Sequence, residues 1–72
     1  LYLIRKEPQA AIPLFDELLG LRPDSPKLWN ERGVALHQTG DYAGAAEAYR
    51  RALALDTRYA IARNNLAVAL FH

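Results

Sequence analysis

Apolar residues recur along most of this chain at steps of three and four, the spacing that places side chains on one face of an α-helix. No segment shows the strict apolar–polar alternation of a strand, so an all-α fold is expected. Helices are predicted over residues 1–6 (the tail of a helix), over 7–21, from Ser25 to Gly40, from Asp41 to the turn at Thr57, and over about 58–71. The short connections imply that successive helices run antiparallel.

Specific residues mark the helix boundaries. Ser25 and Asp41 are predicted N-caps, because their side-chain oxygens can accept hydrogen bonds from the backbone N–H groups of a first turn. Gly40 is predicted to end the third helix in the left-handed conformation, and Thr57 to begin the fifth. Pro13 lies inside the second helix, where it removes one backbone hydrogen bond and is expected to kink or loosen the helix.

The same helical spacing predicts which side chains are buried. The expected faces are Ala11, Phe15, Leu18 and Leu19 on the second helix, Leu28, Trp29, Ala35 and Leu36 on the third, and Tyr42, Ala45, Tyr49, Ala52 and Leu53 on the fourth. On the fifth helix, Leu66, Ala67 and Leu70 are expected to face the fourth.

The pattern repeats along the chain at a fixed step. This repeat step places Asn30 on Asn64 and Val34 on Val68, and it places Phe15 on the chemically similar Tyr49. A repeat of about 34 residues indicates stacked helical units that bury their apolar faces against one another, an architecture that usually binds partners. Residues 1–72 are therefore expected to form one domain, with a partial unit over 1–25, a complete unit over 26–59, and the first helix of a further unit or a capping helix over 60–72.

The central unit resembles a tetratricopeptide repeat. The residues that carry the resemblance are Trp29, Gly33, Leu36, Ala45, Tyr49 and Ala52, with Gly40-Asp41-Tyr42 between the two helices. The resemblance implies antiparallel helix-turn-helix units stacked as a short right-handed α-solenoid of about two repeats. It also implies a protein-interaction or scaffold module. Arg32 and Arg63 depart from the pattern by replacing apolar residues, and Thr57 replaces the usual closing proline.

Gly33 has a physical reason independent of the resemblance. A glycine inside a helix costs about 1 kcal/mol relative to alanine, so a neighbour must require the missing side chain. The expected neighbour is Ala45 on the paired helix, with Trp29 and Tyr49 filling the wider gaps. Arg32 is expected to extend to the rim and to leave a softer contact with the preceding helix.

The resemblance places alternate helices along a concave face. The candidate peptide-binding residues on that face are Lys27, Asn30, Val34, His37, Ile61, Asn64, Val68 and Phe71, extended by Leu3 and Ile4. The two asparagines would hydrogen-bond a partner's backbone, while the apolar residues would receive its side chains. The alternative is ordinary surface, partly covered by further repeats. A carboxylate clamp, as in some relatives, is not predicted, because Val34 and Ile61 occupy positions that would need polar groups.

The fifth helix is apolar on most sides. Because such a helix is normally buried, Ile61, Val68 and Phe71 are expected to need a cover, which would be a continuing repeat or a second copy in a homodimer. Fraying of a terminal helix is the competing interpretation. Both ends of the sequence are apolar, which suggests a piece of a longer chain.

Composition narrows the function further. A net charge of +1 with interspersed acids and bases predicts no nucleic-acid partner, and no apolar run is long enough to predict membrane insertion. Without cysteine, and with His37 and His72 far from other ligands, no metal site or cofactor is expected, and the compartment stays open. The adjacent acids Asp16 and Glu17 would point about 100° apart on a helix, so they could not act together on one substrate. The sequence offers no other catalytic candidate, and the chain is not expected to be an enzyme. The weakest alternative is an enzyme whose active site lies outside this sequence.

Overall fold

The computed structural model describes residues 8–71, with side chains from Ala11 onward. It contains four helices: α1 (Pro8–Leu21), α2 (Pro26–Gln38), α3 (Tyr42–Leu55) and α4 (Ala60–Leu70). The helix predicted over residues 1–6, together with Leu3 and Ile4 of the candidate face, lies outside the described residues. None of the described helices is long and apolar enough to cross a membrane.

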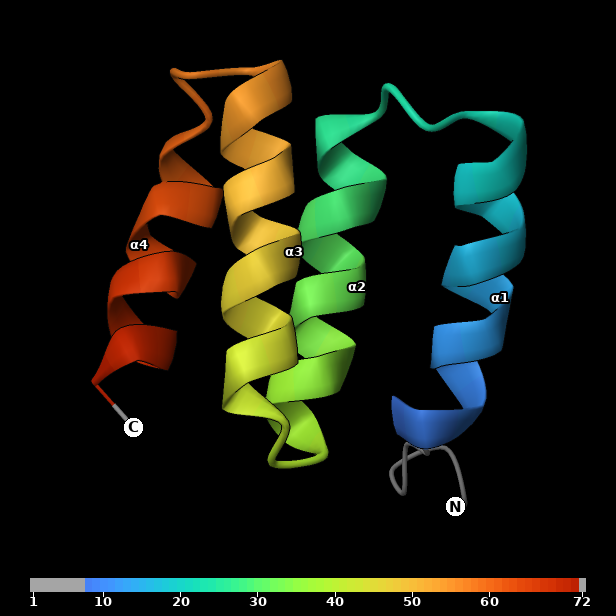
Figure 1. Cartoon of the computed structure of the whole chain (residues 1–72), viewed down its shortest axis with the longest axis horizontal. Helices are drawn as coiled ribbons and strands as arrows, with labels where there is room; N and C mark the ends of the chain where they lie inside the picture. Colours follow the sequence, from blue (N-terminus) through green and yellow to red (C-terminus); the bar gives the residue numbers. More distant parts are fainter. Residues whose placement is uncertain (1–7, 72) are drawn as a thin grey trace, which may run out of the picture.

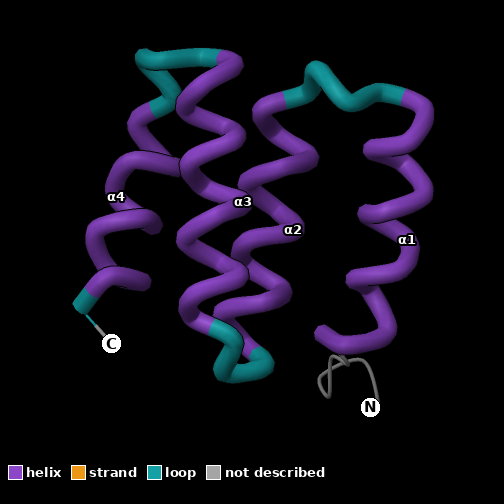
Figure 2. The backbone as a smooth tube through the Cα atoms, viewed as in Figure 1, coloured by secondary structure: helices purple, strands orange, loops and turns teal. Residues whose placement is uncertain are grey.

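Consecutive helices run antiparallel and stack side by side. Figure 1 shows α3 between α2 and α4, with α1 on the other side of α2, and Figure 2 shows the loops alternating between the two ends of the stack. The helix bounds follow the repeat step, since α1 over 8–21 matches α3 over 42–55, and the start of α2 at Pro26 matches the start of α4 at Ala60. The predicted all-α repeat fold of about two units is confirmed.

Three of the predicted boundary residues act as expected. The Ser25 Oγ accepts a hydrogen bond from the Leu28 N–H at 3.2 Å, and the Asp41 carboxylate accepts one from the Gly44 N–H at 2.9 Å. Gly40, with φ of 91°, occupies the left-handed region just after α2. These features involve only neighbouring residues, so local sequence decides them.

The start of α4 differs from the prediction. The Asp56 Oδ1 accepts a hydrogen bond from the Arg58 N–H at 3.1 Å, which closes a turn that contains Thr57. Helix α4 therefore begins at Ala60, with Tyr59 as an N-cap that makes no side-chain bond. The prediction that Thr57 begins this helix is wrong.

The core forms where α2, α3 and α4 meet. It consists of Leu36, Ala45, Ala46, Tyr49 and Ala69, with Ile12, Val34 and Leu66 packed against it. A Cβ placed on Gly33 would lie 2.5 Å from Cε1 of Tyr49. The missing side chain is therefore needed as predicted, but the three atoms nearest to that Cβ position belong to the Tyr49 ring and not to Ala45.

The rotation of α4 corrects one predicted face. Ala62 and Ala69 are the residues that α4 buries, at 0% and 3% exposure, and Leu66 packs against the core. Ala67 is exposed and Leu70 is 59% exposed, so the prediction that both face α3 is wrong. Several apolar stripes were available on this helix, and the stripe with two alanines permits the closest approach to α3.

Helix α1 packs on α2 through an apolar residue and an ion pair. Leu19 is buried as predicted, whereas Leu18 is 44% exposed. The Nε of Arg32 in α2 lies 2.6 Å from the Oδ1 of Asp16 in α1, so Arg32 has a charged partner at the rim that the sequence did not indicate. Helix α1 continues through Pro13 to Leu21.

Candidate protein-interaction surface

Helices α2 and α4 both pack on α3 and also touch each other. The Nδ2 of Asn65 in α4 donates a hydrogen bond to the Oδ1 of Asn30 in α2 at 3.1 Å. This bond ties together two helices that are distant in the sequence. We call the predicted set on these helices the α2–α4 face; its members are Lys27, Asn30, Val34, His37, Ile61, Asn64, Val68 and Phe71.

The α2 half of this face is mostly occupied by internal contacts. Asn30 is 6% exposed and its side-chain oxygen is already bonded to Asn65, and Val34 packs against the core. The His37 ring is half-buried, with its centroid 4.8 Å from that of Tyr42 in an edge-to-face arrangement. Lys27 is the exposed member on this helix.

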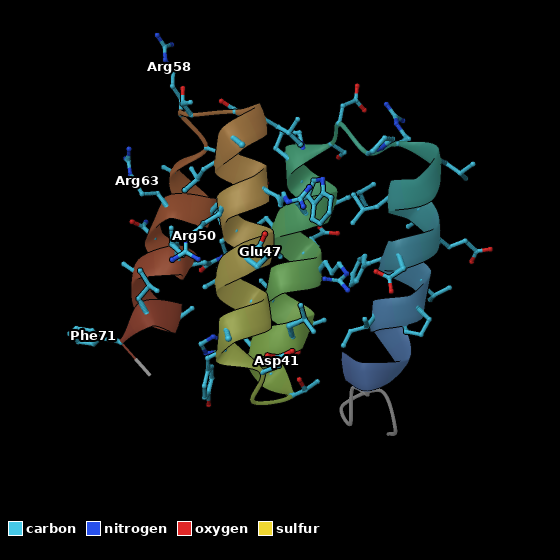
Figure 3. All side chains as sticks on the ribbon, in the orientation of Figure 1. Asp41, Glu47, Arg50, Arg58, Arg63 and Phe71 are labelled. Atoms are coloured by element: carbon cyan, nitrogen blue, oxygen red, sulfur yellow. The ribbon has the colours of Figure 1, made fainter. Side chains whose placement is uncertain are left out.

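The α4 half is open. Ile61, Val68 and Phe71 are 57%, 50% and 92% exposed, and Asn64 is exposed between them. Phe71 projects away from the body of the molecule in Figure 3. A shallow depression of about 230 Å³ is lined by Ala67, Val68 and Phe71. The structure therefore gives the two halves of the face different characters, one polar and engaged, the other apolar and accessible.

Asn65 is the structural residue that sequence reasoning did not connect with Asn30. The repeat step aligns Asn30 with Asn64, which suggested equal roles for those two residues. Asn30 instead bonds to Asn65, the residue after Asn64, because the side chain of Asn65 is the one that points toward α2. The available signal was the Asn64-Asn65 pair, but which of the two turns inward depends on the rotation of α4.

The repeat residues Trp29 and Tyr49 pack between helices next to this face. The Trp29 Nε1 donates a hydrogen bond to the carbonyl oxygen of Pro23 at 2.9 Å, and the Arg51 guanidinium lies 5.3 Å from the centre of the Trp29 ring. Burial raises the pKa of the Tyr49 hydroxyl above its ordinary value of 10.0. The Tyr49 ring fills the space opposite Gly33.

Charged side chains lie around the face without forming a cluster that could hold a metal ion among residues 8–71. Arg63 projects from α4 on the side away from α3, and Arg58 extends from the turn before it (Figure 3). Glu47 and Arg51, four residues apart on α3, form an ion pair at 3.5 Å, with both side chains more than half exposed. Within residues 8–71, no three His, Asp or Glu side chains lie close enough together to hold a metal ion.

Comparison with known families agrees with this architecture. The family model of the tetratricopeptide repeat matches residues 5–60 and again 40–72. Together the two matches cover all four helices. This chain belongs to the tetratricopeptide repeat family.

Proposed function

We propose that this chain binds an extended peptide segment of a protein partner on the α2–α4 face, mainly through the exposed residues of α4. Tetratricopeptide repeats generally mediate protein–protein interaction and scaffolding, and they are typically not catalytic. The observation that carries the proposal is the row of three exposed apolar side chains on α4 beside a shallow depression. Exposed apolar side chains grouped in this way favour a protein partner.

The dimensions of the row suit a short peptide. Ile61, Val68 and Phe71 lie along one helix face, and ten residues of helix extend about 15 Å. An extended strand advances about 3.3 Å per residue, so this length accommodates roughly four or five peptide residues. Alternate peptide side chains would rest on Val68 and Phe71, where the depression lies.

Polar recognition is assigned to one asparagine. Asn64 is exposed and can both donate to and accept from a peptide backbone. The Oδ1 of Asn30 is engaged by Asn65, so Asn30 contributes through its support of α4 rather than by direct contact. Lys27 adds one positive charge at the edge, which favours an acidic residue of the peptide near that side.

The experiment uses an array of peptides of about ten residues with Leu or Phe at alternate positions, followed by fluorescence anisotropy with those that bind. We expect Val68→Ala and Phe71→Ala each to raise Kd roughly 3- to 10-fold, the usual range for losing an apolar anchor. Asn64→Ala should raise Kd about 2- to 5-fold through loss of one hydrogen bond.

Leu21→Ala is the matched control, because Leu21 is 77% exposed on α1 and lies outside the proposed face. It should leave Kd unchanged. If Leu21→Ala weakened binding as much as Val68→Ala, or if no peptide of this pattern bound, the proposed site would be wrong.

A second candidate function is self-association. It is favoured by large apolar side chains exposed at both ends of the stack, Leu14 and Leu18 on α1 and Leu70 on α4. Concentration-dependent mass in sedimentation velocity tests it directly, and a constant monomer mass would exclude it.

A further inference from the structure

The outer sides of α1 and α4, at the two ends of the helix stack, correspond by the repeat step to the two surfaces that meet between α2 and α3. Helix α1 contacts α2 as α3 contacts α4. The side of α1 that corresponds to the α2-facing side of α3 therefore has no helix packed on it among residues 8–71. Leu14 and Leu18 are 59% and 44% exposed, whereas Ala48 and Ala52, their equivalents one repeat step later, are 1% and 0% exposed. The outer side of α1 therefore has the same form as the side of α3 that covers α2.

The other end carries the complementary half. Helix α4 is the repeat equivalent of α2, and Leu70 is the equivalent of Leu36. Leu36 is 8% exposed in a cluster with Ala45 and Tyr49 of α3, but Leu70 is 59% exposed. The cluster that covers Leu36 takes Ala45, Ala46 and Tyr49 from α3 and Ala69 from α4. Helix α1 is the repeat equivalent of α3 among the described residues.

Charge supports the same pairing. Within the molecule, Arg51 of α3 lies over the Trp29 ring of α2, which shows that these two positions adjoin across the interface. The repeat equivalent of Arg51 on α1 is Glu17, and that of Trp29 on α4 is Arg63. Both side chains are exposed and opposite in charge, so the end faces would bring an acid and a base together where the internal interface has a cation and an aromatic ring.

We infer that two copies of this chain associate head to tail, with the outer side of α1 of one copy packed on the outer side of α4 of the next. This inference rests on the self-association candidate above and specifies its geometry. The interface is heterologous, so each added copy leaves the same two faces free at the ends. Assembly therefore proceeds beyond a dimer as concentration rises.

The contact should be looser than its internal counterpart. Gly33 faces the Tyr49 ring with no room for a Cβ, whereas the equivalent positions at the ends are Ala67 and Phe15. The extra methyl group holds the two helices farther apart. We expect a dissociation constant between about 10 µM and 1 mM, the range of weak interfaces, with Leu14 and Leu18 filling part of the wider gap.

The test is charge exchange, followed by sedimentation velocity over that concentration range. Arg63→Glu and Glu17→Arg should each weaken self-association by at least about fivefold, because each places like charges together. A 1:1 mixture of the two variants should regain the wild-type association, since the glutamate introduced on α4 of one copy then meets the arginine introduced on α1 of another, and the unaltered ends also match. Arg58→Glu and Asp24→Arg are the matched controls in exposed turns and should have no effect.

The outcomes separate the geometry from self-association itself. If both variants associate as the wild type does, the head-to-tail pairing is wrong but self-association stands. The same conclusion follows if Arg63→Glu weakens association and Glu17→Arg does not. The second result would indicate α4 packed on α4 of another copy. A monomer of normal helicity throughout the range overturns both. Failure of the mixture to regain association also overturns the proposed pairing.

Discussion

Helices α2 and α4 occupy the same position in successive repeats, yet their surroundings differ. Helix α2 lies between α1 and α3 and buries Asn30, Gly33, Ala35 and Leu36, whereas α4 contacts α3 and α2 and buries Ala62 and Ala69. Three residues of the first set have exposed equivalents on α4, at Asn64, Ala67 and Leu70. A repeat position is therefore buried or exposed according to whether a second helix covers it.

The largest expected contrast is at Gly33 and Ala67. Gly33→Leu places a branched side chain against the buried Tyr49 ring and should lower the free energy of unfolding by about 3 kcal/mol or more. Ala67→Leu adds a side chain of the same kind on the exposed side of α4 and should change stability by less than about 0.5 kcal/mol. Urea denaturation at low protein concentration measures both, and similar losses would mean that the two positions are packed alike.

The next largest expected contrast is in the stability of the variants Asn30→Ala and Asn64→Ala. Asn30→Ala removes the acceptor of the Asn65 amide in a buried site and should cost about 1–2 kcal/mol of stability. Asn64→Ala should cost less than about 0.5 kcal/mol, because Asn64 is exposed. Thermal denaturation checks the difference. If Asn30→Ala were as stable as the wild type, Asn30 would have no structural role and could contact a partner directly.

A smaller effect distinguishes how α2 and α4 contact the helix before them. Arg32 of α2 pairs with Asp16, while its equivalent on α4, Leu66, packs against the core. Both charged groups are partly exposed, so Arg32→Ala should lower stability by no more than about 1 kcal/mol. The difference from wild type should shrink in about 1 M salt, where screening acts within about 3 Å. A loss that salt does not change would indicate that the packing of the Arg32 stem matters more than its charge.

The smallest expected effect on stability at neutral pH comes from the ionisation of Tyr49, which matters only in alkaline solution. Burial raises the pKa of Tyr49 in the folded state above 10.0, so above this pH the unfolded state releases a proton that the folded state retains. Stability should therefore be unaffected by this group well below its ordinary pKa and should fall as pH rises beyond it. Tyr49→Phe should reduce the alkaline fall in Tm. An unchanged pH profile in Tyr49→Phe would exclude Tyr49 as its cause.

Much of the fold could be predicted because its determinants are local. Helical spacing, the caps at Ser25 and Asp41, and the left-handed Gly40 each depend on contacts within a few residues. Prediction failed at the start of α4, where the Asp56 turn competes with a cap at Thr57. It also failed in the rotation of α4, since a helix with several apolar stripes offers more than one face to its neighbour.

The helices that carry the candidate site were predictable, but the contacts and the exposure of its members were not. The resemblance to the family pointed to eight residues on alternate helices, and these residues lie on or directly beside α2 and α4. It could not show that Asn30 is engaged by Asn65, because that bond depends on how two helices distant in the sequence are rotated. Exposure of the α4 residues likewise depends on which helices are neighbours.

By itself the sequence determined the helices, their repeat step, their capping residues and the family, since all of these follow from spacing and residue type along the chain. Only the tertiary structure decided that Tyr49 covers Gly33, that Arg32 meets Asp16, and that Leu70 faces outward. These outcomes depend on the angle and rotation at which helices pack. Close packing selects that arrangement from several that the apolar pattern permits.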